Sequence, residues 1–304
     1  MSNPSTEEPH PMSEPRAEAT RIRDHVQRLG ERHPPVDLAS ADYSLVDPAA
    51  VRERFGHVME YMARVEMEVE RNVLELATLL PGVSDTDRAF YADVWGPQEE
   101  HHGILLDTLT QRLGMPPVVA NTGEVPARVR VLGALAHLPV VHEVIRLLYY
   151  LTGAATEKSA MLAYQAMSDG LGEMGETAVK RTVVDAIKVQ EPGHFAFYRL
   201  SAQEMVQSGA ISGWQLHLAR LLRSRSYGLV GAGTREQRAD FGGVVVELGL
   251  DEELERNVRD ISRVETQLLW AHQQGLQVPA YALAAFRDAA AMYRERRGAS
   301  VLAA

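Results

Sequence analysis

Two glutamate–histidine pairs in this sequence share the spacing Glu-x-x-His: Glu99 with His102, and Glu191 with His194. Residues three apart in an α-helix lie on one face about one turn apart, so each pair can direct a carboxylate and an imidazole to one point. These ligands suit iron or manganese. About one such spacing is expected by chance. The sequence has three, and we attribute the third, in the proline-rich residues 7–10, to chance.

Four amphipathic segments with helical periodicity can each supply one acid on an apolar stripe. They span residues 49–79, 85–114, 139–168 and 174–207. An inward carboxylate on every helix of a bundle is unfavourable unless each is paired or coordinated. A dinuclear metal centre provides that coordination, with one Glu from each of two helices and a Glu-x-x-His from each of the other two. We therefore predict a two-metal site made by Glu66, Glu99, His102, Glu157, Glu191 and His194.

The choice of ligand in the first segment leaves an alternative open. Glu66 fits the apolar stripe, Glu70 is its rival, and Glu68 falls off the stripe. With Glu66, the two acids of the first helix pair are 33 residues apart and those of the second pair 34 apart. A unit that occurs twice is what pseudo-twofold ligand symmetry requires. Each acid alone would be read as a solvated helix residue, whereas the set favours a metal site.

Composition narrows the setting of such a site. The chain has 304 residues and no cysteine, which excludes disulfides and thiolate ligands. Its net charge of −10 disfavours nucleic acid and membrane surfaces as partners. No apolar run approaches the roughly 20 residues that span a bilayer, and no signal-peptide pattern begins the chain. We expect a cytoplasmic protein without membrane insertion.

The elements that must position these residues are helices, so we expect an all-α fold. The first predicted part is a flexible N-terminal arm in residues 1–45, mobile or laid over the surface, with a short helix near 18–29. A four-helix bundle in residues 46–210 follows, and C-terminal helices in residues 211–304 pack on it. The stretch FGGVVVELG (241–249) could be a strand or a buried helical turn.

The stretch WGPQEEHHG (95–103) resembles a signature of the soluble acyl-acyl-carrier-protein desaturases, which are ferritin-like di-iron proteins. Their second ligand helix has a Trp four residues before a Glu-x-x-His-Gly, and Trp95, Glu99, His102 and Gly103 match it. The resemblance covers about residues 55–205. It implies a ferritin-like bundle that binds two iron ions (manganese being an alternative), with O2 as co-substrate and an external electron donor such as ferredoxin. It further implies an acyl-carrier protein or another acyl thioester as partner, and a homodimer.

Three departures from that family concern the surroundings of the metals. Gln98 and Gln190 stand where the family has acids beside its ligand glutamates, and a Gln carbonyl can still accept from an imidazole N–H but brings no charge. Ala160 replaces a Thr one turn after the third-helix Glu. Pro192 and Gly193 should loosen or kink the fourth helix.

Three functions therefore remain open. The first is desaturation of an acyl thioester; the second is another di-iron oxygenase, such as an arylamine N-oxygenase or a hydroxylase of secondary metabolism; the third is a non-catalytic ferritin-like metal-binding protein. For the first, the candidates to line an apolar channel are Met62, Trp95, Leu105, Leu106, Tyr150 and Phe195. The basic residues that could dock an acidic carrier protein are Arg220, Arg223 and Arg225, or alternatively Arg128 and Arg130.

Overall fold

Every regular element in the part of the chain that the structure describes is a helix. This computed structural model describes residues 15–73, 83–120, 127–225, 227–271 and 277–303. The all-α prediction is confirmed. Within the described residues, no helix is both long and apolar enough to cross a membrane.

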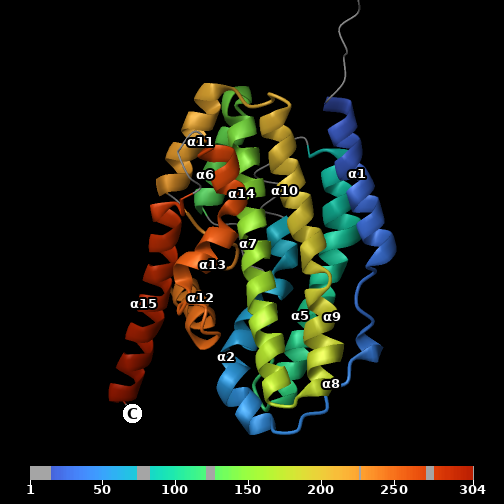
Figure 1. Cartoon of the computed structure of the whole chain (residues 1–304), viewed down its shortest axis with the longest axis vertical. Helices are drawn as coiled ribbons and strands as arrows, with labels where there is room; N and C mark the ends of the chain where they lie inside the picture. The colour runs from blue at the N-terminus through green and yellow to red at the C-terminus, as the bar shows by residue number, and fades with distance from the viewer. Residues whose placement is uncertain (1–14, 74–82, 121–126, 226, 272–276, 304) are drawn as a thin grey trace, which may run out of the picture.

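Four helices form the central bundle and carry the predicted ligands (Figure 1). They are α2 (Pro48–Met67), α5 (Gly96–Arg112), α7 (Pro139–Glu173) and α10 (Glu191–Gln207). α2 packs along α5, and α7 packs along α10. These are the two helix pairs that the repeated ligand spacing predicts. The start of α2 is set locally, because the Asp47 side chain accepts a hydrogen bond from the Ala50 N–H and Pro48 fits the first turn.

Each of the two helical segments that carry a Glu-x-x-His pair contains a wider π-helical turn before its ligands. These segments are named below by their last helix, as the rod of α5 and the rod of α10. The rod of α5 begins as α4 (Asp85–Ala89) and passes through the π-helical η2 (Phe90–Trp95). The rod of α10 runs through α8 (Thr177–Val179), the π-helical η3 (Lys180–Val184) and α9 (Asp185–Lys188). A π-turn shifts the helical register by one residue and is often found at functional sites.

A turn at residues 189–190 separates α9 from α10, as expected from Pro192. Pro192 is the second residue of α10, where a missing N–H costs no hydrogen bond. Gly193 has a different reason, since a Cβ there would lie 2.3 Å from Leu29 Cδ1. The glycine thus lets an N-terminal helix approach α10 closely.

That N-terminal helix lies in the arm that was expected to be mobile or laid over the surface. It is α1 (Pro15–Arg32), longer than the predicted segment, and it packs against α10 and η2. Ile22, Val26 and Leu29 form a stripe at helical spacing and join the hydrophobic core. Residues 1–14 lie outside the described part. Burial of this stripe is why the segment from Pro15 onward is a docked element rather than a free arm.

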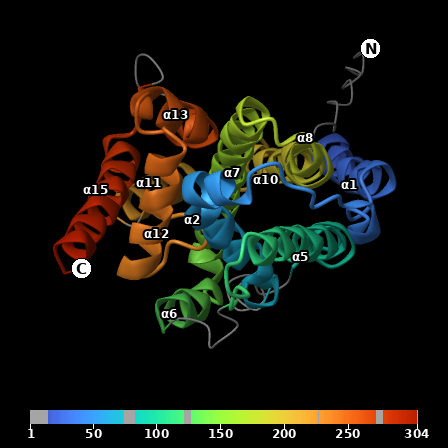
Figure 2. The same cartoon turned by 90° about the horizontal axis from the view of Figure 1, so that it is seen from below.

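The C-terminal helices form a layer on one side of the bundle (Figure 2). They are α11 (Gly213–Arg225), α12 (Arg235–Glu247), α13 (Leu254–Ile261), α14 (Arg263–Leu269) and α15 (Ala280–Ala303). α12 contacts both α2 and α15, while α11, α13 and α14 contact α7. The stretch 241–249 lies in α12 and the turn after it, so the helical alternative is the correct one.

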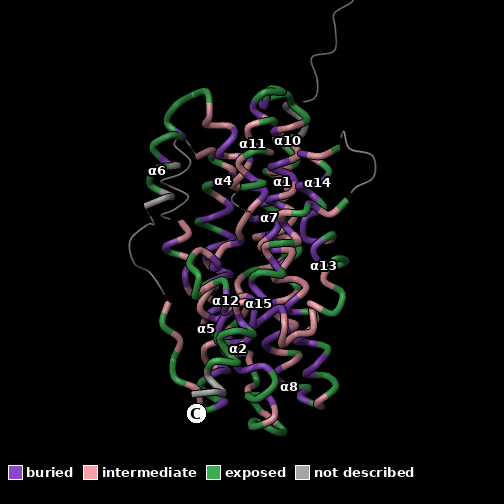
Figure 3. Tube along the Cα trace, turned by 90° about the vertical axis from the view of Figure 1, so that its left-hand side faces the viewer, coloured by how far each residue is buried: buried purple, intermediate pink, exposed green. Residues whose placement is uncertain are grey.

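Two helices of the described residues remain: the short 3-10 helix η1 (Leu38–Ser40), and α6 (Ala127–Ala136), which precedes α7. Figure 3 shows exposed positions along α6, whereas buried positions run through the core of the molecule. The core therefore lies along the bundle and under the C-terminal layer.

Close packing of α7 on α10 depends on Gly153. A Cβ at this position would lie 2.3 Å from Cε1 of Tyr198, a ring atom of a buried side chain. We expect Gly153→Ala to lower the free energy of unfolding by about 1–3 kcal/mol, because the buried ring cannot move away. The matched control on the same helix is Gly172→Ala, where the nearest atom is Lys180 Cε at 3.4 Å. Urea unfolding should show the control unchanged or slightly stabilised; equal losses in both variants would contradict this account.

Candidate metal centre

The structure brings all six predicted site residues into one buried cluster. α2 supplies one carboxylate, α7 supplies another, and α5 and α10 each supply a Glu-x-x-His pair. Each of the six residues is 7% exposed or less: Glu66, Glu99, His102, Glu157, Glu191 and His194. The exposed Glu70 lies outside the cluster, so Glu66 is the acid that the first helix contributes.

Two carboxylates lie between the two histidines. His102 Nδ1 is 3.3 Å from Glu191 Oε1 and 3.9 Å from Glu99 Oε2. His194 Nδ1 is 2.9 Å from Glu99 Oε1 and 3.8 Å from Glu191 Oε2. Glu99 and Glu191 thus each lie within 4 Å of both imidazoles.

The other two carboxylates each belong to one histidine. Glu66 Oε2 lies 4.0 Å from His102 Nδ1, and Glu157 Oε2 lies 3.8 Å from His194 Nδ1. These residues form two groups that can each hold a metal ion, and Glu191 belongs to both. Within each group, the ligand atoms lie within 4.8 Å of one another. The groups are Glu66, His102 and Glu191, and Glu99, Glu157, Glu191 and His194.

The donor atoms of the cluster fit a pair of divalent cations. Four buried atoms, Nδ1 of both histidines and Oε1 of Glu99 and Glu191, have no hydrogen-bond partner. Buried polar atoms without a protein partner are rare in native proteins, and a bound water or ion commonly satisfies them. No Lys or Arg in the described residues forms an ion pair with these carboxylates. Four carboxylates carry the charge that two divalent cations would neutralise.

Without a cation, burial and mutual repulsion favour the protonated form of the carboxyl groups in the cluster. Burial, and then the neighbouring carboxylates, raise the pKa of Glu99, Glu157 and Glu191 well above the usual value. Burial lowers the pKa of His102 to about 4 and also lowers the pKa of His194. The imidazoles are therefore neutral at pH 7, the state that a metal ligand requires.

Gln98 and Gln190, which directly precede Glu99 and Glu191, fix both imidazoles across the bundle. His102 Nε2 lies 2.6 Å from Gln190 Oε1, and His194 Nε2 lies 2.5 Å from Gln98 Oε1. The amide groups donate to main-chain carbonyls, Gln190 to Pro34 at 2.7 Å and Gln98 to His33. A carbonyl only accepts, so each amide NH2 must face it and each amide oxygen must face an imidazole N–H. The proton is thereby placed on Nε2, which leaves Nδ1 free to bind a metal.

We expect Gln98→Leu to weaken metal binding by about 10- to 100-fold, because His194 loses the acceptor that orients its ring. Gln111→Leu is the matched control, since Gln111 lies exposed on the same helix and donates to Asp107. Titration against a competing chelator measures both affinities. If the two variants bind metal equally well, the hydrogen bond has no orienting role.

The sequence did not reveal two further parts of this shell. Residues 33 and 34 supply the main-chain carbonyls that accept from Gln98 and Gln190. Their side chains give no sign of this role, because only the main chain takes part. Tyr164 donates a hydrogen bond of 2.7 Å to Glu66 Oε1, and burial raises the pKa of this phenol well above its usual value. Its signal in the sequence is its position seven residues after Glu157, which places the phenol on the same helix face as that carboxylate.

Gly103 and the other polar neighbours of the signature have structural explanations. A Cβ on Gly103 would lie 2.5 Å from Met67 Cγ, so this glycine lets α5 approach α2 beside the cluster. Glu100 is exposed, while His101 is half-buried with its Nδ1 2.8 Å from the Val36 carbonyl. Glu68 is fully buried but is held by Arg64 and Arg71 outside the cluster.

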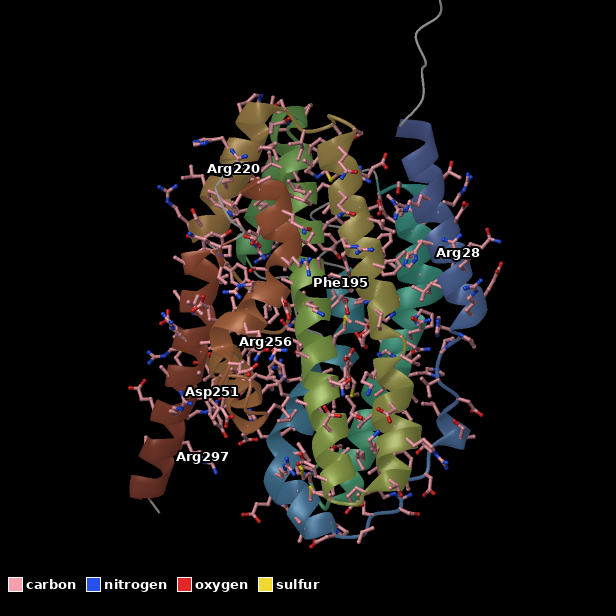
Figure 4. The ribbon with its side chains drawn as sticks, viewed as in Figure 1. Arg28, Phe195, Arg220, Asp251, Arg256 and Arg297 are labelled. Atoms are coloured by element: carbon pink, nitrogen blue, oxygen red, sulfur yellow. The ribbon has the colours of Figure 1, made fainter. Side chains whose placement is uncertain are left out.

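Only some of the expected channel residues lie at the cluster. Met62 and Trp95 line cavities that reach it. Leu105 and Leu106 are core residues, and Tyr150 donates to buried Asp87. Phe195 is half-buried between α7 and α10, with Arg199 5.8 Å from its ring centre (Figure 4).

Fold and site together define an all-α protein with a buried cluster of four glutamates and two histidines that can hold metal ions. In comparisons with known proteins, no family model, no curated protein and no solved structure matches the chain.

Proposed function

We propose that this protein is a di-iron, O2-dependent oxidoreductase of the ferritin-like type. The observation that carries the proposal is the position of Glu99 and Glu191 between two imidazoles that point their unprotonated nitrogens at them. When bound, a pair of reduced iron ions supplies the activation of O2 needed to remove hydrogen from an unactivated C–H bond.

The protein's own part is to hold the ligands and to exclude water. Gln98 and Gln190 hold the imidazoles, and Tyr164 holds Glu66. Packed rings cover the His194 side, where Phe90 stacks on Phe197 with ring centres 3.6 Å apart. A cluster enclosed in this way keeps bulk water from the reacting groups.

For the reaction we propose desaturation of an acyl chain carried as a thioester, with an external electron donor such as ferredoxin. Its support is the Trp95-to-Gly103 signature together with the apolar cavity that reaches the cluster. Neutral Gln98 and Gln190 and the small Ala160 favour a second candidate, oxygenation of another substrate such as an arylamine. A homodimer remains part of the proposal.

The structure gives little support to one expected docking face for an acidic carrier protein, because one of its three arginines is buried. Arg223 is buried and donates to Glu265 at 2.8 Å, and Arg220 of α11 donates to the Leu269 carbonyl (Figure 4). Arg225 is exposed, but alone it makes no face. Arg130 is exposed, so the face near α6 remains the candidate; the side chain of Arg128 lies outside the described residues.

Metal analysis and oxygen uptake test this proposal. Freshly purified protein should contain about two iron ions per chain. After reduction, it should consume O2 with a change in the visible spectrum. An acyl thioester that alters this change supports desaturation, whereas an arylamine that does so supports the second candidate. Protein that binds iron but consumes no O2 would leave only the non-catalytic alternative.

A further inference from the structure

Two adjoining cavities lead from the cluster into the C-terminal layer. The first, here the metal-side cavity, is lined by Trp95, Glu99, Glu157 and Glu191 among others. The second, here the tail cavity, lies between α2, α7 and the C-terminal helices and is lined by residues that include Met62, Ala160, Val245 and Phe286. Five residues line both: Val65, Glu66, Thr156, Ala160 and Val230. The tail cavity therefore adjoins the carboxylate cluster at Glu66 and extends away from it.

The lining of the tail cavity offers almost nothing to a polar ligand. Glu66 is the one carboxylate on it among the described residues, and Tyr164 already holds that carboxylate. This described lining has no Lys, Arg or His, and Tyr61 adds one phenol, whose pKa burial raises. Ser159 donates to the Ala155 carbonyl at 2.8 Å, and Thr156 Oγ1 accepts from the Val230 N–H at 3.1 Å. A polar group placed here would lose water without gaining partners, which is unfavourable. An apolar occupant loses nothing of this kind and gains from burial.

At the boundary between the two cavities, the backbone adopts a conformation that requires glycine. Gly231 has φ +75°, and a Cβ there would lie 2.5 Å from Val65 Cγ2, so only glycine fits. The bond from Val230 to Thr156 fixes this segment against α7. Val230 is consequently held at the junction, beside Glu66.

Away from the shared residues, the tail cavity is lined by the C-terminal helices. Phe241 of α12 and Phe286 of α15 meet edge to face, with ring centres 5.2 Å apart. Val245 is buried on the next turn of α12, and Ile261 of α13 is also buried. Residues from beyond the four-helix bundle thus determine how deep the cavity is.

We propose that the tail cavity binds the hydrocarbon tail of the substrate, and that Val245 and Phe286 set the length of tail that it accepts. This inference rests on the proposed function, in which the reacting bond lies at the carboxylate cluster. It gives the C-terminal layer a role in substrate selection, since the bundle alone would leave the cavity open.

The test is calorimetric titration of the zinc-loaded protein, in which no oxidation occurs, with N-acetylcysteamine thioesters of increasing acyl length. The dissociation constant should fall by about fourfold per added methylene until the tail fills the cavity, and then stay level. Val245→Phe should bring that limit about three or four carbons earlier, by the added ring carbons. Phe286→Leu, which enlarges the same end, should move the limit to longer tails.

Val246→Phe is the matched control, because this neighbouring valine does not line the cavity. Its limit should equal that of the unaltered protein. The inference is overturned if both cavity variants share that limit, or if affinity does not depend on tail length. Iron-loaded protein that fails to consume O2 while the limits still shift would reject the proposed function and leave the binding site in place.

Discussion

Glu191→Ala is expected to remove both metal ions, lowering the metal content from about two ions per chain to near zero. Glu191 is the one residue common to both ligand groups, so its loss leaves each of them short of a ligand. His102→Ala should behave differently. It removes one group and leaves Glu99, Glu157, Glu191 and His194 in place, so about one ion should remain.

Elemental analysis after anaerobic loading and desalting measures these contents. Glu70→Ala is the control, because Glu70 is exposed and outside the cluster. It should retain the full metal content. Full metal content in the Glu191 variant would show that the cluster is not the metal site, and equal losses in the two cluster variants would show that Glu191 does not bridge.

Metal binding should raise the melting temperature by about 8–12 °C at metal concentrations near a thousand times the dissociation constant, and the increment should grow with pH. Raised pKa values mean that Glu99, Glu157 and Glu191 stabilise the metal-free fold in their protonated form. That contribution is complete below pH 4.5, their ordinary pKa, and is lost as the pH rises through the raised values. Cations that replace these protons restore the stability where it has been lost.

The histidines act in the opposite direction. Burial lowers the pKa of His102 to about 4, so its contribution is present above pH 6.5 and is lost as the pH falls toward 4. Between pH 5.5 and 8 the imidazole of His102 is already neutral, so it adds no pH dependence to metal binding there. Metal binding becomes stronger at higher pH because protons on the three carboxylates compete with the cations for the same oxygen atoms. Calorimetric melting of metal-free and Mn²⁺-loaded protein measures the increment. An increment that stays constant or falls with pH contradicts this account, and Glu191→Ala should show none.

The sequence alone predicted the all-α fold, the four helices and the six residues that converge. It could do so because helical spacing dictates which side chains share a face, and because a buried acid on every stripe has few explanations. The same logic favoured Glu66 and left Glu70 as an alternative, and the structure decided between them. The local sequence also predicted the interruption of the helix before Glu191, because Pro192 lacks the backbone N–H that would continue the hydrogen-bond pattern.

Tertiary structure decided what depends on neighbours distant in the chain. Gln98 and Gln190 were visible as departures, but only the fold showed that each reaches the histidine of the opposite helix. The main-chain carbonyls of residues 33 and 34 carry no signature in the sequence, and α1 docks because Gly193 leaves room for Leu29. Arg223 looks like surface charge in its own helix and is buried by a partner 42 residues away. Spacing along one helix fixes which face a residue occupies, whereas the group that meets that face is chosen only when the helices pack.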